Sequence, residues 1–410
     1  MDIKKYYKKP PEKSREISGK NSVIRKIDIF LFVIAIVVLF SIVSFSIIFS
    51  FGDPPRSEIS VSPNFWLLLG NDTANKLIQE FEEQNPDFVI LKAKDETENL
   101  SDADVVIFDD YDLGRLVEKS ALTSLDKYIH TEAQDAQWID NWVIPLVRFV
   151  DLFAYNIDIL KAANLDRPPK TIREFISTAR AVARIDPAQF GHEVIYPLAL
   201  GLSEKDPMAY RRDIFPWIWA NEEDFFQQVS DEIVFSKNTK DIFDFFYELD
   251  RNDLLAPDPF NRTGTMGLEE FAAGKVAMMT ISSRDILYLK NAANDINYSI
   301  TSIPAASLGK NRLGISVIYA GINSNCTVPD EAWSLLAFIA GRTQIFAQSL
   351  AAIPGRYPAN YPGEYVIKDS LLRKAWEIYE SADIVEYKPD YALETAINET
   401  LREKLAEVLR

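Results

Sequence analysis

Strand-like and helix-like patterns alternate along residues 63–129, and this order constrains the fold more than any other feature. Short apolar runs at residues 65–69, 88–91 and 105–108 are typical of buried strands. Between the first two runs, apolar residues recur at helical spacing, and the following Asn85-Pro86 predicts the end of that helix. Because strands that alternate with helices favour a parallel sheet covered by helices, we expect an α/β architecture.

Local signals are also clear near the middle of the chain. Residues 152–155 form a short apolar and aromatic run, as in a buried strand, and Pro168-Pro169 then prevents a helix. Thr171, with Glu174 three residues later, forms a capping box. The sequence therefore predicts a helix from near Thr171 to about Ala183.

The longest apolar segment, residues 29–51, contains no charged residue, proline or glycine. A helix of this length is about 34 Å long, which is enough to cross a hydrocarbon core of about 30 Å. Residues 1–28 carry nine Lys or Arg and four Asp or Glu, so the positive-inside rule predicts a basic cytoplasmic tail, a transmembrane anchor and an extracytoplasmic remainder. A cleaved signal peptide is the alternative, but its apolar core is about 7–15 residues and ends in an A-x-A-like site that this chain lacks.

The composition of residues 52–410 excludes several classes of partner. The whole chain has a net charge of −17 and the tail contributes +5, which leaves −22 for the remainder. Such acidity disfavours nucleic acid and anionic membrane surfaces. Cys326 is the only cysteine, so there is neither a disulfide framework nor a lipid anchor. The length suggests two domains, and we expect a monomer whose extracytoplasmic part is soluble without the anchor.

Motifs for catalysis, metals or cofactors are missing from the sequence. The two histidines, His130 and His192, do not form a metal-binding pair, and there is no nucleophile elbow or phosphate-binding glycine loop. Asp109-Asp110 is weak evidence for a catalytic or metal site, because the chain has 61 acidic residues. We therefore predict a protein without catalytic residues, metal or cofactor, and not an enzyme.

Several phrases of the sequence resemble bacterial extracellular solute-binding proteins, the maltose-binding-protein-like receptors of ABC importers. They occur at residues 155–159, 168–171, 268–279 and 318–338, in the order that the family has them. The resemblance extends over nearly all of residues 63–400. In the phrase at 155–159, Ile157 replaces the lysine that is usual in the family.

This resemblance implies a type II periplasmic-binding-protein fold, in which two discontinuous α/β lobes are joined by three hinge crossings. We expect the crossings near residues 147–149, 316–320 and 351–355. The expected organisation is a tail at 1–28, an anchor at 29–51, a linker at 52–63, a first lobe made of 64–147 and 320–352, and a second lobe made of 148–319 and 353–410.

Two positions near the ends of expected strands are candidate ligand contacts. Asp110 and Tyr111 follow the strand at 105–108, at the edge where open α/β sheets bind ligands, although Asp110 could instead cap the next helix. Arg148 lies in the first crossing. A cleft arginine can hold a carboxylate or a hydroxyl, but Arg148 could equally pair with an acid such as Asp151 and fix the hinge.

The remaining candidates come from the segments that line the cleft in the resembled family. Trp217 is either a stacking platform for a sugar ring or part of the core, and Tyr319 is either a ligand contact or hinge packing. Arg284 and Asp285 stand where the family often has a stacking tryptophan. The candidates include two arginines but few certain stacking partners. We therefore expect a polar or partly anionic ligand, such as an oxidised sugar, ahead of a neutral oligosaccharide.

The resemblance implies a receptor in the bacterial inner membrane with its binding region in the periplasm. It would bind a small polar solute, such as a carbohydrate or a sugar derivative, and deliver it to an ABC permease. The alternative is an anchored sensory or assembly protein that keeps the fold without transport. Glu222-Glu223 replaces the two glycines that the family commonly has, and this difference is compatible with a protein that has lost transport.

Overall fold

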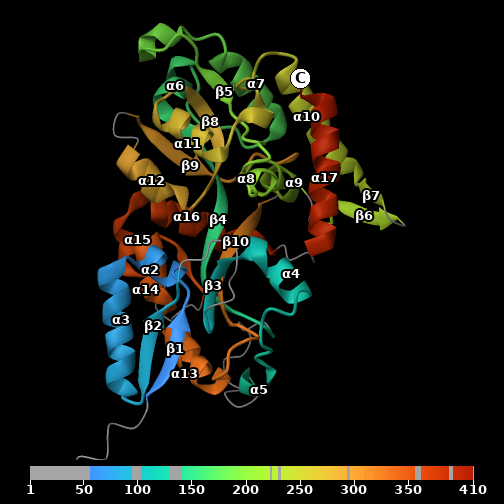
Figure 1. Ribbon diagram of the computed structural model, residues 1–410. Coiled ribbons are helices and arrows are strands. Elements are labelled where there is room, and N and C mark those ends of the chain that lie inside the picture. The colour runs from blue at the N-terminus through green and yellow to red at the C-terminus, as the bar shows by residue number, and fades with distance from the viewer. Residues whose placement is uncertain are drawn as a thin grey trace, which may run out of the picture. The chain divides into compact units, whose positions relative to one another are not determined.

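The computed structural model describes residues 56–94, 103–129, 141–221, 224–229, 232–292, 296–309, 311–355, 362–386 and 391–409 (Figure 1). The predicted tail at 1–28, the anchor at 29–51, residues 52–55 of the linker and His130 lie outside the described residues. No helix within the described ranges is long and apolar enough to cross a membrane. Residues from Ser57 onward form one compact unit.

The described unit is built on a mixed sheet whose main path runs β2-β1-β3-β10-β4-β8-β5. Outside this path, β11 and β9 each pair with β4, and β12 pairs with β10. The long strand β4 runs through the centre of this unit (Figure 1). The strands are β1 Ser57–Val61, β2 Phe88–Lys92, β3 Val105–Asp109, β4 Ile144–Asn156, β5 Tyr196–Leu198, β8 Val276–Ser282, β9 Tyr298–Thr301, β10 Arg312–Ile322, β11 Ile353–Pro354 and β12 Asp383–Glu386.

The first half-sheet consists of β1, β2, β3 and the parts of β10 and β4 next to them. Strand β1 pairs in parallel with β2 and β3, and β10 runs antiparallel to β3. Helix α3 (Asn71–Gln84) buries its four apolar residues at helical spacing, as predicted, and ends at Asn85. The other helices here are α2 (Asn64–Leu69), α4 (Asp110–Glu118), α5 (Asp126–Ile129), α13 (Pro329–Ala340) and α14 (Thr343–Leu350).

One strand prediction in this half is wrong. Residues 65–69 form helix α2, because Phe65, Trp66 and Leu69 are buried on one side while Leu67 is 80% exposed, a helical spacing. The first strand instead lies at Ser57–Val61, inside the predicted linker 52–63. There Ile59 and Val61 alternate with polar residues and are fully buried.

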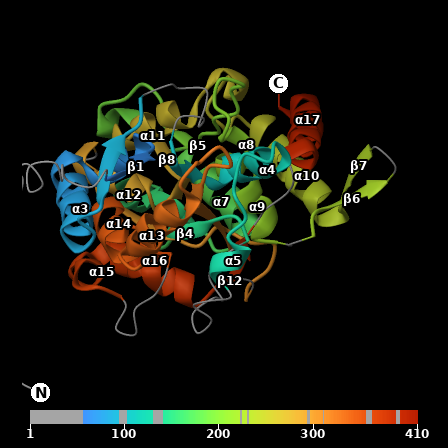
Figure 2. The same ribbon diagram turned by 60° about the horizontal axis from the view of Figure 1, so that its bottom comes forward.

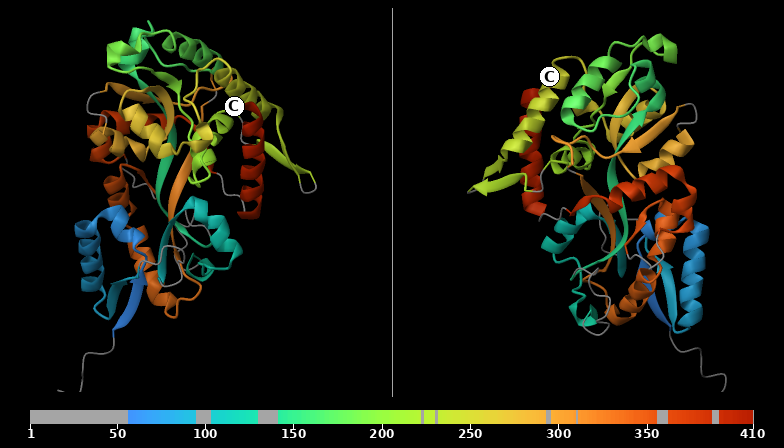
Figure 3. Two further views of the ribbon diagram at one scale, coloured as in Figure 1. Left: turned by 45° about the horizontal axis from the view of Figure 1, so that its top comes forward. Right: turned by 180° about the vertical axis from the view of Figure 1, so that it is seen from behind.

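The second half-sheet consists of the C-terminal part of β4 with β8, β9 and β5. It is covered by helices that include α6 (Ile157–Ala162), α7 (Ile172–Val182), α8 (Ala209–Asp213), α9 (Phe215–Trp219), α10 (Lys237–Asp250), α11 (Gly264–Ala272) and α12 (Asp285–Ala292). The described C-terminal part adds α15 (Glu364–Lys368), α16 (Ser370–Glu380) and α17 (Tyr391–Val408). Helix α17 packs beside α10 and also contacts α4 (Figure 3). A hairpin of β6 (Phe226–Val229) and β7 (Glu232–Phe235) projects near α10 and α17 (Figure 2).

The predicted cap of α7 is confirmed. The Thr171 hydroxyl accepts the Glu174 N–H at 3.2 Å, and α7 ends at Val182, one residue before the expected end. Gly274, after α11, has a φ of +75°, which a glycine adopts without steric cost. Helix α7 therefore begins where the capping box predicts.

The three segments predicted as crossings lie side by side at the middle of the sheet. Arg148 of β4 is opposite Val317 of β10 and also opposite Ile353 of β11. Both pairings are antiparallel, and β10 shifts register between Ile318 and Tyr319. Three adjacent strands therefore connect the two half-sheets.

Candidate functional site

A cavity of about 390 Å³ is lined by residues between Asp151 and Ser316, and one of them, Arg284, forms an ion pair with Asp109 at the end of β3. Its walls come from β4, β10, the end of β8, the segment before α8 and the start of α11. Thr263, Thr265, Ser282 and Ser316 contribute to the lining, whereas no Trp, Tyr or Phe does so among the described residues. Seven charged side chains complete it: Lys205, Arg211, Arg212, Arg284, Asp151, Asp206 and Asp285.

Arg211 is the most deeply held of these cations. Its guanidinium lies 3.3 Å from the Asp151 carboxylate, donates to the carbonyl of Ile315 and lies 4.1 Å over the ring of Trp219. Only 9% of the Arg211 side chain and 8% of the Asp151 side chain are exposed. These contacts join α8, β4 and β10, so Arg211 acts as a brace at the centre of the protein.

Arg212 is held by a second set of carboxylates. It lies 2.8 Å from Asp206 and 3.3 Å from Asp213, and Asp213 in turn accepts the Thr280 hydroxyl at 3.0 Å. A Cβ at Gly264 would lie 1.7 Å from the Arg212 guanidinium carbon, so the side chain fits only because residue 264 is glycine. Arg212 is therefore part of the wall and fully engaged by the protein.

Arg284 is held more loosely than either. It forms an ion pair with Asp109 at 2.9 Å, with 44% and 50% of the two side chains exposed, and lies 4.6 Å over the ring of Phe149. Asp109 ends β3 in the first half-sheet, whereas Arg284 follows β8 in the second. This ion pair therefore connects the two half-sheets at the edge of the cavity.

Three acids lie near enough to Arg211 to feel its charge: Asp151 is buried, and Asp110 and Glu394 are half-buried. Burial raises the pKa of Asp110 to about 6 and of Asp151 to about 7, although Arg211 opposes both shifts. Burial and the nearby Asp110 also raise the pKa of Glu394, at the start of α17, to about 7. Arg211 thus offsets only part of the desolvation of these three carboxyl groups, and their pKa values lie closer to neutral pH than those of exposed acids.

Two of the predicted site residues, Arg284 and Asp285, line the cavity. The Asp285 carboxylate accepts the Ser282 N–H at 2.8 Å, and burial raises its pKa. Asp110 and Tyr111 do not line it. Asp110 is at the first position of α4 and accepts the Val317 N–H at 3.0 Å, while Tyr111 is half-buried beside it.

Three other predicted site residues also have structural positions outside the cavity lining. Arg148 donates to the carbonyl groups of Pro354, at 3.4 Å, and Gly355, so it ties two of the adjacent strands together. Trp217 has no exposed surface and packs in the aromatic core, which rules out a stacking platform in this structure. Tyr319 is also buried, and its hydroxyl lies 3.2 Å from the Glu386 carboxylate.

Most of the charged lining was not identified from the sequence. Lys205, Asp206, Arg211 and Arg212 fall in a segment without a recognisable motif, and Asp151 was considered only as a partner of Arg148. The available signal was the density of charge between Glu204 and Asp213, next to the strongly apolar α9. Charges beside a fully buried helix indicate a buried or partly buried ionic network.

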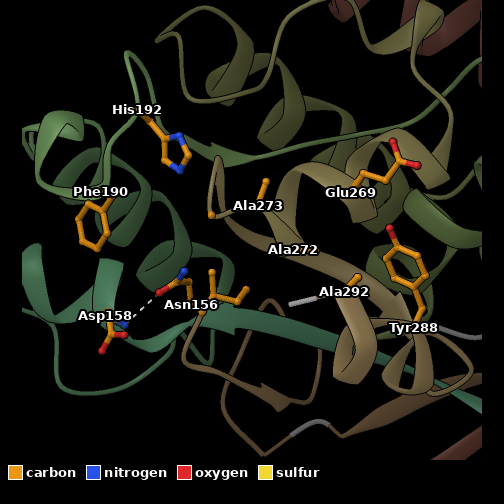
Figure 4. A pocket seen from close by; sticks show the side chains of 11 residues that line it. Asn156, Asp158, Phe190, His192, Glu269, Ala272, Ala273, Tyr288 and Ala292 are labelled. Atoms are coloured by element: carbon orange, nitrogen blue, oxygen red, sulfur yellow. Dashed lines mark hydrogen bonds between the residues drawn. The ribbon is translucent and has the colours of Figure 1, made fainter. Parts of the chain in front are cut away.

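A second cavity, of about 410 Å³, is formed by α6, α11, α12 and the segment after η3 (Pro187–Phe190) (Figure 4). Phe190 and Tyr288 line it, as do His192 and the carboxylates of Asp158 and Glu269. Asn156 Oδ1 accepts the Asp158 N–H at 3.0 Å and so caps α6. None of the predicted site residues lines this cavity.

Metal binding has no support among the residues that the structure describes. They contain no group of three or more His, Cys, Asp or Glu side chains arranged to hold an ion. The acids of the central cavity face arginines or backbone N–H groups instead. The arrangement is suited to holding a polar molecule by hydrogen bonds and ion pairs.

Solved structures of similar fold are receptors for small molecules. The GacH receptor of Streptomyces glaucescens, solved with acarbose, has a TM-score of 0.63 and 16% identity, covering 86% of this chain and 93% of that one. UgpB from Mycobacterium tuberculosis, with glycerophosphocholine, has a TM-score of 0.66 and 16% identity, with coverage of 87% and 94%. A cyclic alpha-maltosyl-1,6-maltose binding protein from Arthrobacter globiformis has a TM-score of 0.65 and 14% identity, with coverage of 86% and 94%.

The sequence itself is also similar to a known family. Curated protein sequences give no match, but the model of the bacterial extracellular solute-binding protein family matches residues 76–362, which is more than half of the chain. The mixed sheet with two halves agrees with the two-lobe α/β fold of the similar structures. The chain therefore belongs to the bacterial extracellular solute-binding protein family.

Proposed function

We propose that this protein is a membrane-anchored extracytoplasmic receptor that binds a small polar solute and delivers it to an ABC permease. The observation that carries the proposal is the charged cavity whose Arg284 reaches Asp109 of the first half-sheet. Ligands of open α/β sheets bind beyond the ends of strands, and the ends of β3 and β8 meet at this cavity. The protein is a binding protein and has no catalytic role.

The two half-sheets correspond in this proposal to two lobes, residues 64–147 with 320–352 and residues 148–319 with 353–410. The three adjacent segments at 147–149, 316–320 and 351–355 form the hinge. Because a ligand between the lobes touches both, it stabilises the closed form by its additional contacts there. The permease then recognises this closed form.

Anchoring through residues 29–51 would keep the receptor close to its permease. The length of this apolar segment and the basic residues before it support an uncleaved anchor. Tethering raises the effective concentration of the receptor at the membrane without any new contact. The mass of the mature protein extracted from membranes tests this, since a chain that starts between residues 40 and 60 would show cleavage.

Carbohydrates and their derivatives are the first ligands to test. Structures of similar fold hold acarbose and glycerophosphocholine, which is consistent with a polar, hydroxyl-rich ligand. The full-length protein in detergent can be unfolded by heat in the presence of sugars, polyols, amino acids and organic acids. A true ligand at 100 times its Kd raises stability by about 2.7 kcal/mol, whereas no stabilisation by any compound would contradict the proposal.

A further inference from the structure

We propose that the ligand carries an anionic group, which binds Arg284 and Lys205, and that Asp109 holds Arg284 until this group displaces it. This inference rests on the proposed receptor function and names the class of ligand. It would give the site a preference for acids over neutral sugars. Four features of the cavity support it.

The first feature is that two of the cations in the cavity wall already form ion pairs with carboxylates of the protein. Arg211 and Arg212 are held by buried or partly buried carboxylates of the protein itself. Removing a buried charge from such a partner costs several kcal/mol, so neither arginine is available to a ligand. Lys205 and Arg284 are the cations that remain among the described residues of the lining.

The second feature is the exposure of the pair between Arg284 and Asp109. Both side chains are close to half exposed, and exposed ion pairs contribute only about 0–1 kcal/mol. Only the Nη2 atom of Arg284 contacts Asp109, and its other guanidinium N–H groups make no hydrogen bond to a described residue. A carboxylate or phosphate of a ligand can therefore replace Asp109 with a two-point contact.

The third feature is Lys205, an exposed residue in the wall of the same cavity. Its ammonium group forms no ion pair with any residue that the structure describes, although acids are abundant in this chain. The carboxylate of Asp285 is already occupied by the Ser282 N–H. An anion in the cavity would thus meet one uncommitted cation and one that is easily released.

The fourth feature is the lack of a stacking surface. Among the residues that the structure describes, no Trp, Tyr or Phe side chain lines the cavity, and the nearby Phe149 ring is covered by Arg284. A neutral sugar ring would therefore lack the aromatic partner that apolar sugar faces favour. The overall acidity of the protein does not cancel the local attraction, because salt screens fields beyond about 8 Å at physiological ionic strength.

The test uses matched pairs of probes on the full-length protein in detergent. Glucuronate is compared with glucose, glycerol 3-phosphate with glycerol, and further sugar acids and organic acids with their neutral counterparts. Binding is measured by titration calorimetry and by thermal stabilisation. We expect the anionic member of at least one pair to bind at least tenfold more tightly than its neutral counterpart.

Variants then separate competition from a simple effect of charge. Arg284→Gln should weaken binding of the anion at least tenfold and Lys205→Met several-fold, whereas Asp109→Asn should tighten it about threefold or more, because the competitor is removed. Asp112→Asn is the matched control, since Asp112 is a nearby acid that pairs with Arg115 instead. It should change the affinity less than twofold.

Each result decides between the possibilities. If only neutral compounds bind, the receptor function stands and this inference is wrong. If Asp109→Asn weakens binding or has no more effect than Asp112→Asn, Asp109 does not compete with the ligand, and the displacement is refuted. If no compound binds at all, the proposed function fails together with the inference.

Discussion

Arg211 and Arg284 line the same cavity, but the protein holds them in opposite ways. Arg211 is buried, and its contacts with Asp151, Ile315 and Trp219 fix it on three sides. Arg284 is close to half exposed and has one exposed carboxylate partner. The first arginine therefore contributes mainly to folding, whereas the second remains free to change its partner.

This difference shows why residue type alone does not identify a binding residue. Both arginines offer the same planar set of donors to a carboxylate. They differ in the free energy needed to separate the arginine from its carboxylate, which is high for a buried ion pair and low for an exposed one. Four predictions, from the largest expected effect to the smallest, test the comparison.

Loss of Arg211 should have the largest effect. Arg211→Met leaves the Asp151 carboxylate buried without its cation, so the free energy of unfolding should fall by about 3–5 kcal/mol. The measurement is urea denaturation followed by the fluorescence of the buried Trp217 and Trp219. A fall in the free energy of unfolding of less than about 1 kcal/mol would contradict a stabilising role for Arg211.

Arg148 should also act on stability. Arg148→Met removes the hydrogen bonds to the carbonyl groups of Pro354 and Gly355, and a bond to a charged donor contributes about 1.5–3 kcal/mol. The same denaturation curves should show a loss of that size. Ligand affinity should change less than twofold, and a tenfold loss would instead place Arg148 in the binding site.

The three acids near Arg211 predict a dependence of stability on pH. The pKa values of Asp110, Asp151 and Glu394 are raised to about 6 or 7, while unfolded carboxyl groups titrate near 4. Stability is therefore highest below the unfolded pKa and is lost as the pH rises through the folded pKa. Between those two pKa values, each group lowers the free energy of unfolding by up to about 1.4 kcal/mol per unit rise in pH.

Unfolding at pH 5.5 and at pH 7.5 checks this prediction. Stability should be higher at pH 5.5, and Asp151→Asn should reduce the difference because one titrating carboxyl is gone. Equal stability at both pH values in the unmodified protein would show that the acids are ionised throughout this range. In that case Arg211 would compensate all three carboxylates.

Arg284 should have the smallest effect on stability. Arg284→Gln removes only an exposed ion pair, so the free energy of unfolding should change by less than about 1 kcal/mol. The variant should melt within a few degrees of the unmodified protein. A loss as large as that of Arg211→Met would erase the distinction between the two arginines.

The local structure around the cavity could be predicted well from the sequence. Helical spacing predicts α3 and a capping box predicts α7, and β4, β10 and β11 pair at the centre of the sheet. These features depend on neighbours in sequence or on the family pattern. Strand β1 was missed because its buried Ile59 and Val61 alternate with polar residues in a segment rich in Pro and Ser.

The site itself could be predicted only in part. The resemblance to the family predicts Arg284 and Asp285 as candidates, because they stand where the family often has a stacking tryptophan, and both line the cavity. Trp217 was a candidate because an aromatic ring suits a core and a stacking platform equally. Its burial is decided by Phe153, Phe175 and other rings from distant segments, which a sequence pattern does not reveal.

The most direct test asks whether the ligand occupies the charged cavity lined by Lys205, Thr265 and Arg284. Thr265 and Met266 are neighbours on α11 and both are exposed, but only Thr265 lines the cavity. Thr265→Trp and Met266→Trp therefore add the same bulk inside and outside the site. Titration with any ligand found by thermal screening should show at least a tenfold loss of affinity for Thr265→Trp and less than a twofold change for Met266→Trp. Equal affinities for the two variants would contradict the assignment of the binding site to this cavity.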